Sequence, residues 1–181
     1  MKKNKLLLVI ILCCLVVVVT ACSNDKTIIM NPQPEISNNL YGSYEYFDVD
    51  GVSISFPVVN EWIVFSGGTC GLLKGVSCNH SSDNNLTIQT DGVYRITYGA
   101  TGKGSNNHKF ITAFFVNGEV VNSTRDIMIS SAGEIHKMRG DTDIELYSGD
   151  VLDLRIRDTT SSGSGTVYEF DINIQSLGVI S

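Results

Sequence analysis

The sequence predicts an all-β fold, a sandwich or a barrel, on three observations. Stretches in which apolar and polar residues alternate recur from about residue 48 to the C-terminus. Turn pairs such as Asn117-Gly118 and Gly149-Asp150 separate these stretches. No stretch keeps the 3.6-residue period that an amphipathic helix requires, and the 17 glycines and only 18% charged residues fit strands and turns better than a helical bundle.

The first 21 residues are predicted to be a signal peptide. Lys2, Lys3 and Lys5 precede an almost wholly apolar run from Leu6 to Val19, which is the pattern of a secretory signal. A membrane-spanning helix needs roughly 20 apolar residues, so the run is short for one, although an uncleaved anchor helix stays open as an alternative.

The end of this segment, Val19-Thr20-Ala21-Cys22, resembles the lipobox of bacterial lipoproteins. The resemblance implies cleavage before Cys22 and attachment of a diacylglyceryl group to its sulfur. Further acylation, as in that family, would hold the protein stably on a membrane. We therefore expect a lipid-anchored protein of the bacterial cell envelope, in the outer membrane where the host has two. An ordinary signal peptide with a chance cysteine is the alternative.

The rest of the chain divides into a tether and one domain. Residues 22–47 are mostly polar with two prolines, and we expect the lipidated cysteine and a flexible tether there. Residues 48–181 are expected to form the folded domain. Its strands are predicted, in order, at residues 52–56, 62–65, 86–89, 94–100, 110–116, 120–121, 144–146, 152–157 and 168–175.

The order of these pieces resembles the globular head of the complement first-component q subunit, within the tumour necrosis factor-like jelly-roll superfamily. The resemblance covers roughly residues 50–181. It implies a jelly-roll β-sandwich, and its known members pack three protomers around an axis. The collagen-like Gly-X-Y stalk of the complement heads is absent from this sequence, so no function of that stalk carries over. The carrying segments are residues 85–88, 91–98, 114–118, 144–154 and 176–180.

Two of the five cysteines remain for a disulfide. Cys13 and Cys14 lie in the segment that is removed, and Cys22 is predicted to be lipidated. Cys70 and Cys78 in an exported domain then predict a disulfide bond.

One strand carries two apolar faces, which suggests that it is buried on both sides. In residues 110–116, Ile111, Ala113 and Phe115 oppose the side chains expected to face the core. We expect these three residues to form the interface of a homotrimer. The alternative is that residues 48–60 of the same chain fold over them.

The sequence contains no recognisable motif for catalysis or metal binding. We therefore expect that the protein is not an enzyme and that it binds no cofactor or metal. His80, His108 and His136 have no partner at catalytic or ligand spacing. The acidic pairs 48/50 and 141/143 offer too few oxygens for a calcium site of six to eight ligands.

The net charge of the chain indicates which classes of partner it can bind. The net charge is −6, although the N-terminal segment is basic, which argues against nucleic acid as a partner. We expect a trimeric surface module that recognises a protein or glycan ligand. Two alternatives stay open: a structural or decorative protein of a phage or cell coat, and a hydrolase with a carboxylate pair.

Overall fold

The computed structural model describes residues 39–79, 85–131 and 133–179. Every described residue belongs to the compact unit that spans residues 36–181. The predicted signal peptide and the lipidation site Cys22 lie outside the described residues. Within them, no helix has the length and apolarity needed to cross a membrane.

The described part is built from strands, with a single 3₁₀ turn, η1 (Asn122–Thr124). The strands are β1 (Tyr41–Phe56), β2 (Ile63–Val64), β3 (Thr69–Lys74), β4 (Val76–Asn79), β5 (Asn85–Ile88), β6 (Gly92–Gly104), β7 (Lys109–Val116), β8 (Glu119–Val120), β9 (Asp126–Ile129), β10 (His136–Leu146), β11 (Val151–Asp158) and β12 (Gly163–Val179).

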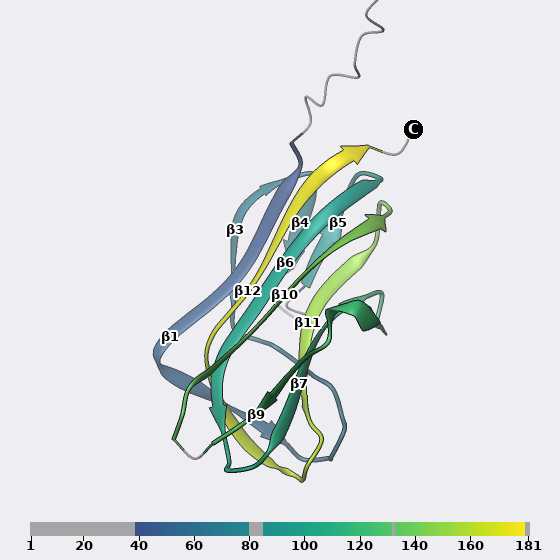
Figure 1. Cartoon of the computed structure of the whole chain (residues 1–181). Coiled ribbons are helices and arrows are strands. Elements are labelled where there is room, and N and C mark those ends of the chain that lie inside the picture. Colours follow the sequence, from purple (N-terminus) through teal and green to yellow (C-terminus); the bar gives the residue numbers. More distant parts are fainter. Residues whose placement is uncertain (1–38, 80–84, 132, 180–181) are drawn as a thin grey trace, which may run out of the picture. The chain divides into compact units, whose positions relative to one another are not determined.

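These strands form two antiparallel sheets, which confirms the predicted β-sandwich. Sheet A has the order β10-β6-β12-β1-β3. Sheet B has the order β4-β5-β11-β7-β8, with β2 added beside β11 and β9 beside β7. From β5 onward, apart from the short strands β8 and β9, successive strands lie in alternate sheets: β5, β7 and β11 lie in sheet B, while β6, β10 and β12 lie in sheet A (Figure 1). This winding is that of a jelly roll.

The folded domain begins earlier than the predicted residue 48. Residues 41–47 are strand and pair with residues 169–175 of β12. A register shift between Phe47 and Val52 interrupts the strand. There, Asp48 Oδ1 accepts hydrogen bonds from the amides of Asp50 and Gly51, at 2.9 and 3.3 Å. This acidic turn interrupts the period-2 pattern, which is why the sequence suggested a tether up to residue 47.

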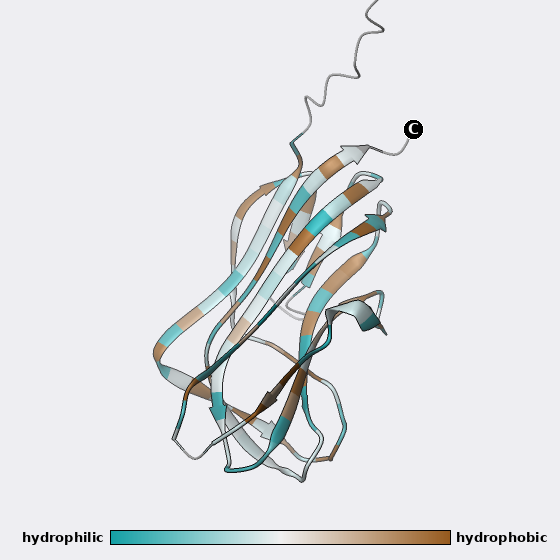
Figure 2. Ribbon diagram, in the orientation of Figure 1, coloured by the Kyte–Doolittle hydropathy of each residue, from teal (hydrophilic) through white to brown (hydrophobic). Residues whose placement is uncertain are grey.

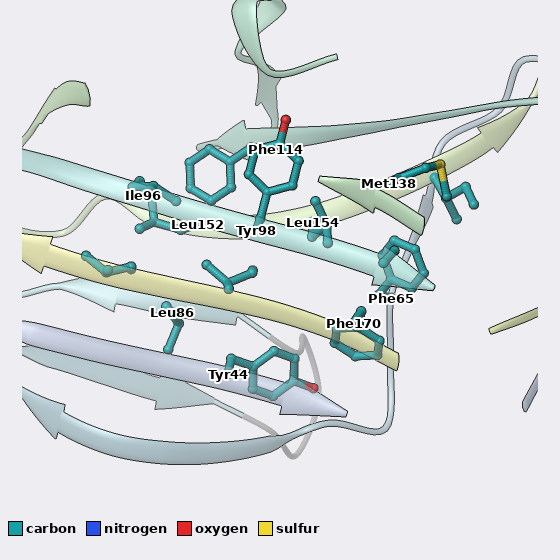
Figure 3. Packing of buried hydrophobic residues seen from close by; sticks show 14 of the residues in the cluster. Tyr44, Phe65, Leu86, Ile96, Tyr98, Phe114, Met138, Leu152, Leu154 and Phe170 are labelled. Carbon is teal, nitrogen blue, oxygen red and sulfur yellow. The ribbon is translucent and has the colours of Figure 1, made fainter. Parts of the chain in front are cut away.

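The core lies between the sheets, and alternate residues of β6, which are Tyr94, Ile96, Tyr98 and Ala100, point into it. Bands of hydrophobic and hydrophilic residues alternate along β6 and β12 in Figure 2. Tyr98 of β6 and Phe114 of β7 stack in this core with ring centroids 6.3 Å apart, and these two residues and Phe170 of β12 are almost fully buried (Figure 3). Phe65 packs on Phe170 with ring centroids 4.9 Å apart. Both turns singled out in the sequence are present, since Asn117, Gly118 and Gly149 all have positive φ angles.

Candidate functional site

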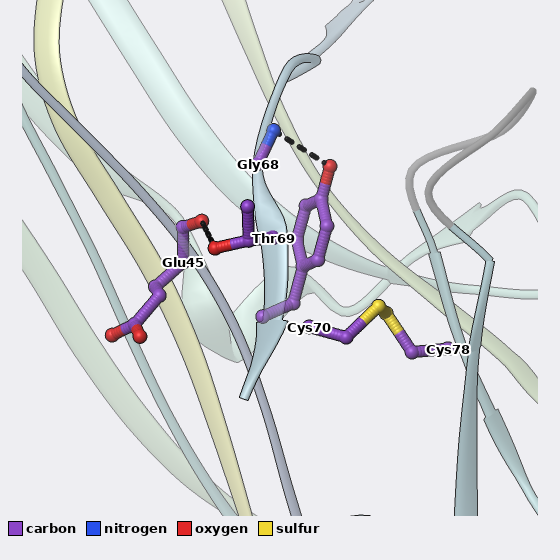
Figure 4. The surroundings of a disulfide bond; sticks show 6 residues. Glu45, Gly68, Thr69, Cys70 and Cys78 are labelled. Carbon is purple, nitrogen blue, oxygen red and sulfur yellow. Dashed lines mark hydrogen bonds between the residues drawn. A yellow bond between two sulfur atoms is a disulfide. The ribbon is translucent and has the colours of Figure 1, made fainter. Parts of the chain in front are cut away.

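The disulfide predicted from the sequence is confirmed. Cys70 of β3 and Cys78 of β4 are bonded, with their Cα atoms 6.0 Å apart. β3 is an edge strand of sheet A and β4 is an edge strand of sheet B, so the bond joins the two sheets at one side of the sandwich. Figure 4 shows it next to Gly68, whose amide donates to the Tyr44 hydroxyl at 3.0 Å.

The residues predicted as the trimer interface are covered by their own chain. Ile111, Ala113 and Phe115 are 8%, 0% and 3% exposed in the single chain. The two-sided burial of β7 is therefore correct, but the cover comes from the same chain, which was the alternative to a trimer interface at these three residues. The cover comes partly from Trp62, whose ring meets that of Phe115 edge-on at 5.1 Å.

Two arginines complete this cover on the outward face of sheet B. The Arg155 guanidinium lies 4.2 Å from the centre of the Phe115 ring, and that of Arg157 lies 4.4 Å from the Trp62 ring. Asp153 binds Arg155 through two hydrogen bonds of 2.6 and 2.8 Å, and these raise the pKa of Arg155. Burial lowers the pKa of Arg157. Aromatic rings and guanidinium groups therefore form a layer over the Phe115 side of β7.

The outward face of sheet A has no such cover. Its side chains form cross-strand rows of mixed charge. Arg95 binds Asp143 through two hydrogen bonds of 2.8 Å, and these lower the pKa of Asp143. Four rows follow from the strand registers: Lys137, Thr101, Glu169 and Phe47; Arg139, Gly99, Asp171 and Glu45; Asp141, Thr97, Asn173 and Ser43; Asp143, Arg95, Gln175 and Tyr41.

A hollow of about 540 Å³ opens on this face over β10, β6 and β12. Gly99 pairs in register with Arg139 and Asp171, which line the hollow, and an added Cβ there would stand only 3.0 Å from an Asp171 oxygen and 3.3 Å from Arg139 Cγ. Burial raises the pKa of Asp171, against the opposing effect of the nearby Arg139. The Asn173 side-chain amide donates to Asp171 at 2.8 Å. Asp171 is thus partly desolvated on a face that is otherwise open.

Exposed apolar side chains lie beside these charges. Phe47 and Leu72 are 77% and 78% exposed, and Tyr41 is 40% exposed. Tyr41 and Leu72 line a second hollow of about 450 Å³ together with Arg95. We call the outward side of β3, β1, β12, β6 and β10 the sheet A face. A face with apolar and charged side chains together is suited to contact with a protein surface.

His108, expected to have no partner, is the centre of a cluster that the sequence did not reveal. Its Nδ1 atom lies 2.5 Å from Asp158 Oδ2, and its Nε2 atom lies 3.3 Å from Ser161 Oγ. β7 and β11 are neighbours in sheet B, and their register sets Asp158 opposite Phe110, two residues after His108. That register was the missing signal, because the partners stand 50 and 53 residues from His108.

The other histidines behave differently. His136 lies 3.7 Å from the Glu134 carboxylate at the surface, and His80 lies outside the described residues. Within the described ranges, no three His, Cys, Asp or Glu side chains stand together as ligands for a metal ion.

Comparison with solved structures identifies the fold. Neither a family model nor a curated protein matches the chain. Among solved structures, Eiger TNF from S. frugiperda is similar with a TM-score of 0.57 and 11% identity, over 79% of this chain and 95% of that one. Murine APRIL at pH 5.0 is similar with a TM-score of 0.50 and 11% identity, over 76% of this chain and 99% of that one. The fold is a tumour necrosis factor-like jelly roll, as predicted.

Proposed function

We propose that this chain is a lipid-anchored protein of the bacterial cell envelope, whose jelly-roll domain forms a homotrimer and recognises a protein or glycan ligand. The proposal depends on one observation above all: the sheet A face is open, whereas Ile111, Ala113 and Phe115 on the outward face of sheet B are covered by their own chain. On that face, Ile127 and Ile129 of β9 remain exposed. The function needs no catalysis and no cofactor.

Support for the anchor comes from the segment Val19-Thr20-Ala21-Cys22. We expect the Cys22→Ser chain to move from the detergent phase to the aqueous phase on phase separation, because the acyl chains that hold it to the membrane are lost. A mature N-terminus that is unlipidated and lies elsewhere than at Cys22 would rule out the anchor.

Support for the trimer comes from the exposed apolar side chains of the sheet A face. Three protomers can form a closed ring in which each contact joins two different surface patches, so no apolar patch is left open. Full burial of a Phe side chain such as Phe47 stabilises an association by about 1.5–3 kcal/mol. The charges of both signs on the same face can set the register of the contact.

The trimer is tested by measuring the mass of the Cys22→Ser chain by light scattering. We expect a trimer for this chain and a monomer when Phe47→Arg and Leu72→Arg are added. Ile129→Arg is the matched control, since Ile129 is a 64% exposed apolar residue of β9 at the edge of sheet B. A monomer at tens of micromolar overturns the trimer, and dissociation by Ile129→Arg alone places the contact on the other sheet.

Ligand recognition is tested with a glycan array and a pull-down from the native host. A trimer presents three copies of a site, so its apparent affinity for a multivalent surface exceeds that of one site. We therefore expect the trimer to be retained on its ligand surface and the Phe47→Arg, Leu72→Arg chain to wash off. Equal retention of both chains would contradict multivalent recognition.

A further inference from the structure

Two loops at one end of the sandwich bring a serine, a histidine and an aspartate into a hydrogen-bonded line. His108 ends the loop between β6 and β7, while Asp158 and Ser161 flank the start of the loop between β11 and β12. The order of contacts is Ser161 Oγ to His108 Nε2 at 3.3 Å and His108 Nδ1 to Asp158 Oδ2 at 2.5 Å. The two ring nitrogens thus serve two different partners.

The contact with the Asp158 carboxylate sets which nitrogen of a neutral His108 ring carries the proton. The Asp158 side chain is 0% exposed, and a buried carboxylate is costly unless donors surround it. One oxygen accepts from the Thr160 amide at 2.8 Å, and the other faces His108 Nδ1. A carboxylate only accepts, so Nδ1 is the donor, and the neutral ring presents the lone pair of Nε2 to the Ser161 hydroxyl.

The imidazole is also held in place by its neighbours. Its ring stacks on Phe110 with centroids 6.1 Å apart and an interplanar angle of 25°. Gly163 lies beside the ring, and an added Cβ there would be in van der Waals contact with His108 Cε1, at 3.4 Å. The His108 side chain is only 15% exposed. Nε2 is therefore aimed at Ser161 before any substrate arrives, which is what a general base requires.

The geometry points to a second function, acyl transfer, with Ser161 as nucleophile, His108 as general base and Asp158 as the residue that positions His108. Ser161 Oγ attacks the carbonyl carbon of an ester while His108 Nε2 takes the hydroxyl proton. The bond from the carbonyl carbon to the alcohol oxygen then breaks, and His108 returns the proton to that oxygen. Water attacks the acyl-serine, its proton passes through His108 to Ser161 Oγ, and the carboxylic acid leaves.

The surroundings of Ser161 indicate the substrate class. Within their own two loops, the residues next to His108 and Ser161 are small or polar and exposed to solvent. The exposed apolar residues nearby, Val58 and Ile129, lie on other segments. A short acyl group on a polar alcohol, such as an acetyl ester of a sugar hydroxyl, fits these loops. The exposed residues around the cluster are Ser105, Asn106, Asn107, Lys109, Thr160, Ser162, Gly163 and Ser164.

This activity does not rest on the trimer or on the lipid anchor. The cluster belongs to one chain and to the loops at the end of the sandwich, away from the hollows of the sheet A face. Loss of the trimer in the Phe47→Arg, Leu72→Arg chain is expected to leave the reactivity of Ser161 unchanged.

The test treats the purified full chain with a fluorophosphonate probe and locates the adduct by mass spectrometry. We expect phosphonylation of Ser161, no adduct in Ser161→Ala, and an undiminished adduct in the control Ser162→Ala. His108→Asn keeps a side-chain N–H for Asp158 but has no group at the place of Nε2. Its labelling rate should fall about a hundredfold, the usual size of general-base catalysis.

Hydrolysis of p-nitrophenyl esters gives a second readout that does not depend on the probe. We expect the acetate to be hydrolysed faster than the octanoate, and the activity to disappear with Ser161→Ala. Circular dichroism confirms folding of each variant, and Ser161→Ala decides the matter if His108→Asn does not fold. No adduct on Ser161, or equal ester hydrolysis by the wild-type and Ser161→Ala chains, overturns the proposal.

Discussion

The outward faces of the two sheets differ in whether the chain itself covers the apolar side chains that point away from the core. Sheet B carries Ile111, Ala113 and Phe115 on its outward side and covers them with its own chain. Sheet A leaves Phe47 and Leu72 in solvent beside a ladder of charges. An apolar residue that faces away from the sandwich core therefore does not by itself indicate contact with another subunit. It does so only if no segment of the same chain covers it.

Removal of Phe115 is expected to have the largest effect on stability. Phe115→Ala leaves a cavity beneath Trp62 and Arg155, and large-to-small changes of buried Phe cost about 3–5 kcal/mol. Chemical denaturation should show this loss in the free energy of unfolding at any protein concentration. A loss seen only at low concentration would mean that Phe115 contributes to association instead.

Removal of the disulfide is expected to cost less. Cys70→Ser with Cys78→Ser frees the link between the edge strands β3 and β4, and closing a loop of this size contributes roughly 2–3 kcal/mol, less any strain. Thermal unfolding of oxidised and reduced wild-type chains should reproduce the same difference. Equal stability of the two forms would show that the link between the sheets does not contribute to stability.

Phe47→Ala is the counterpart of Phe115→Ala on the open face. Because Phe47 is 77% exposed, the change should alter the unfolding free energy of the isolated chain by less than about 0.5 kcal/mol. The same change should weaken association, measured by sedimentation over a range of concentrations. A cost as large as that of Phe115→Ala would show that the two faces do not differ.

The smallest effect concerns pH, and it separates two aspartates of the sheet A face. Burial raises the pKa of Asp171 above 3.8, while Arg95 lowers that of Asp143. Between 3.8 and its folded pKa, Asp171 binds more proton in the folded chain, so its contribution to stability grows as the pH falls through that window. Asp143 acts oppositely, because its stabilisation is lost as the pH falls through its lowered pKa.

The measurement is the midpoint of thermal unfolding against pH. At neutral pH, Asp171→Asn should raise the midpoint and Asp143→Asn should lower it. Both differences should shrink in acid, where the wild-type carboxyl groups are protonated. A fall in the midpoint of Asp171→Asn at neutral pH would contradict the raised pKa.

Features within one strand or one turn could be predicted from the sequence. The alternation in β6, β11 and β12, the Asn117-Gly118 hairpin and the double burial of β7 all depend on neighbouring residues. The disulfide followed from counting the cysteines that remain after the predicted signal peptide and lipidation site. The ordered set of these segments was enough to predict the jelly roll through its resemblance to tumour necrosis factor-like domains.

Features that need the pairing of distant strands could not be predicted. Trp62 reaches Phe115 because β2 adds to β11 at Val64 and Arg155, and no local pattern reveals that addition. The cluster of His108, Asp158 and Ser161 depends on the register of β7 with β11 in the same way. The start of β1 at Tyr41 was hidden by the turn at Asp48 and by the polar residues before it.

The antiparallel ladder between β1 and β12 has a mechanical consequence. Tyr41 is opposite Gln175 at one end, and Phe56 is opposite Gly163 at the other, next to Ser161. The segment of β12 between these pairs spans roughly 40 Å at about 3.3 Å per residue. If Cys22 is anchored and the loop around Ser161 is held by a distant surface, tension enters at Tyr41 and runs parallel to the strands. The hydrogen bonds of the ladder lie across the strands. A force parallel to the strands therefore loads them together in shear, and they do not break one after another.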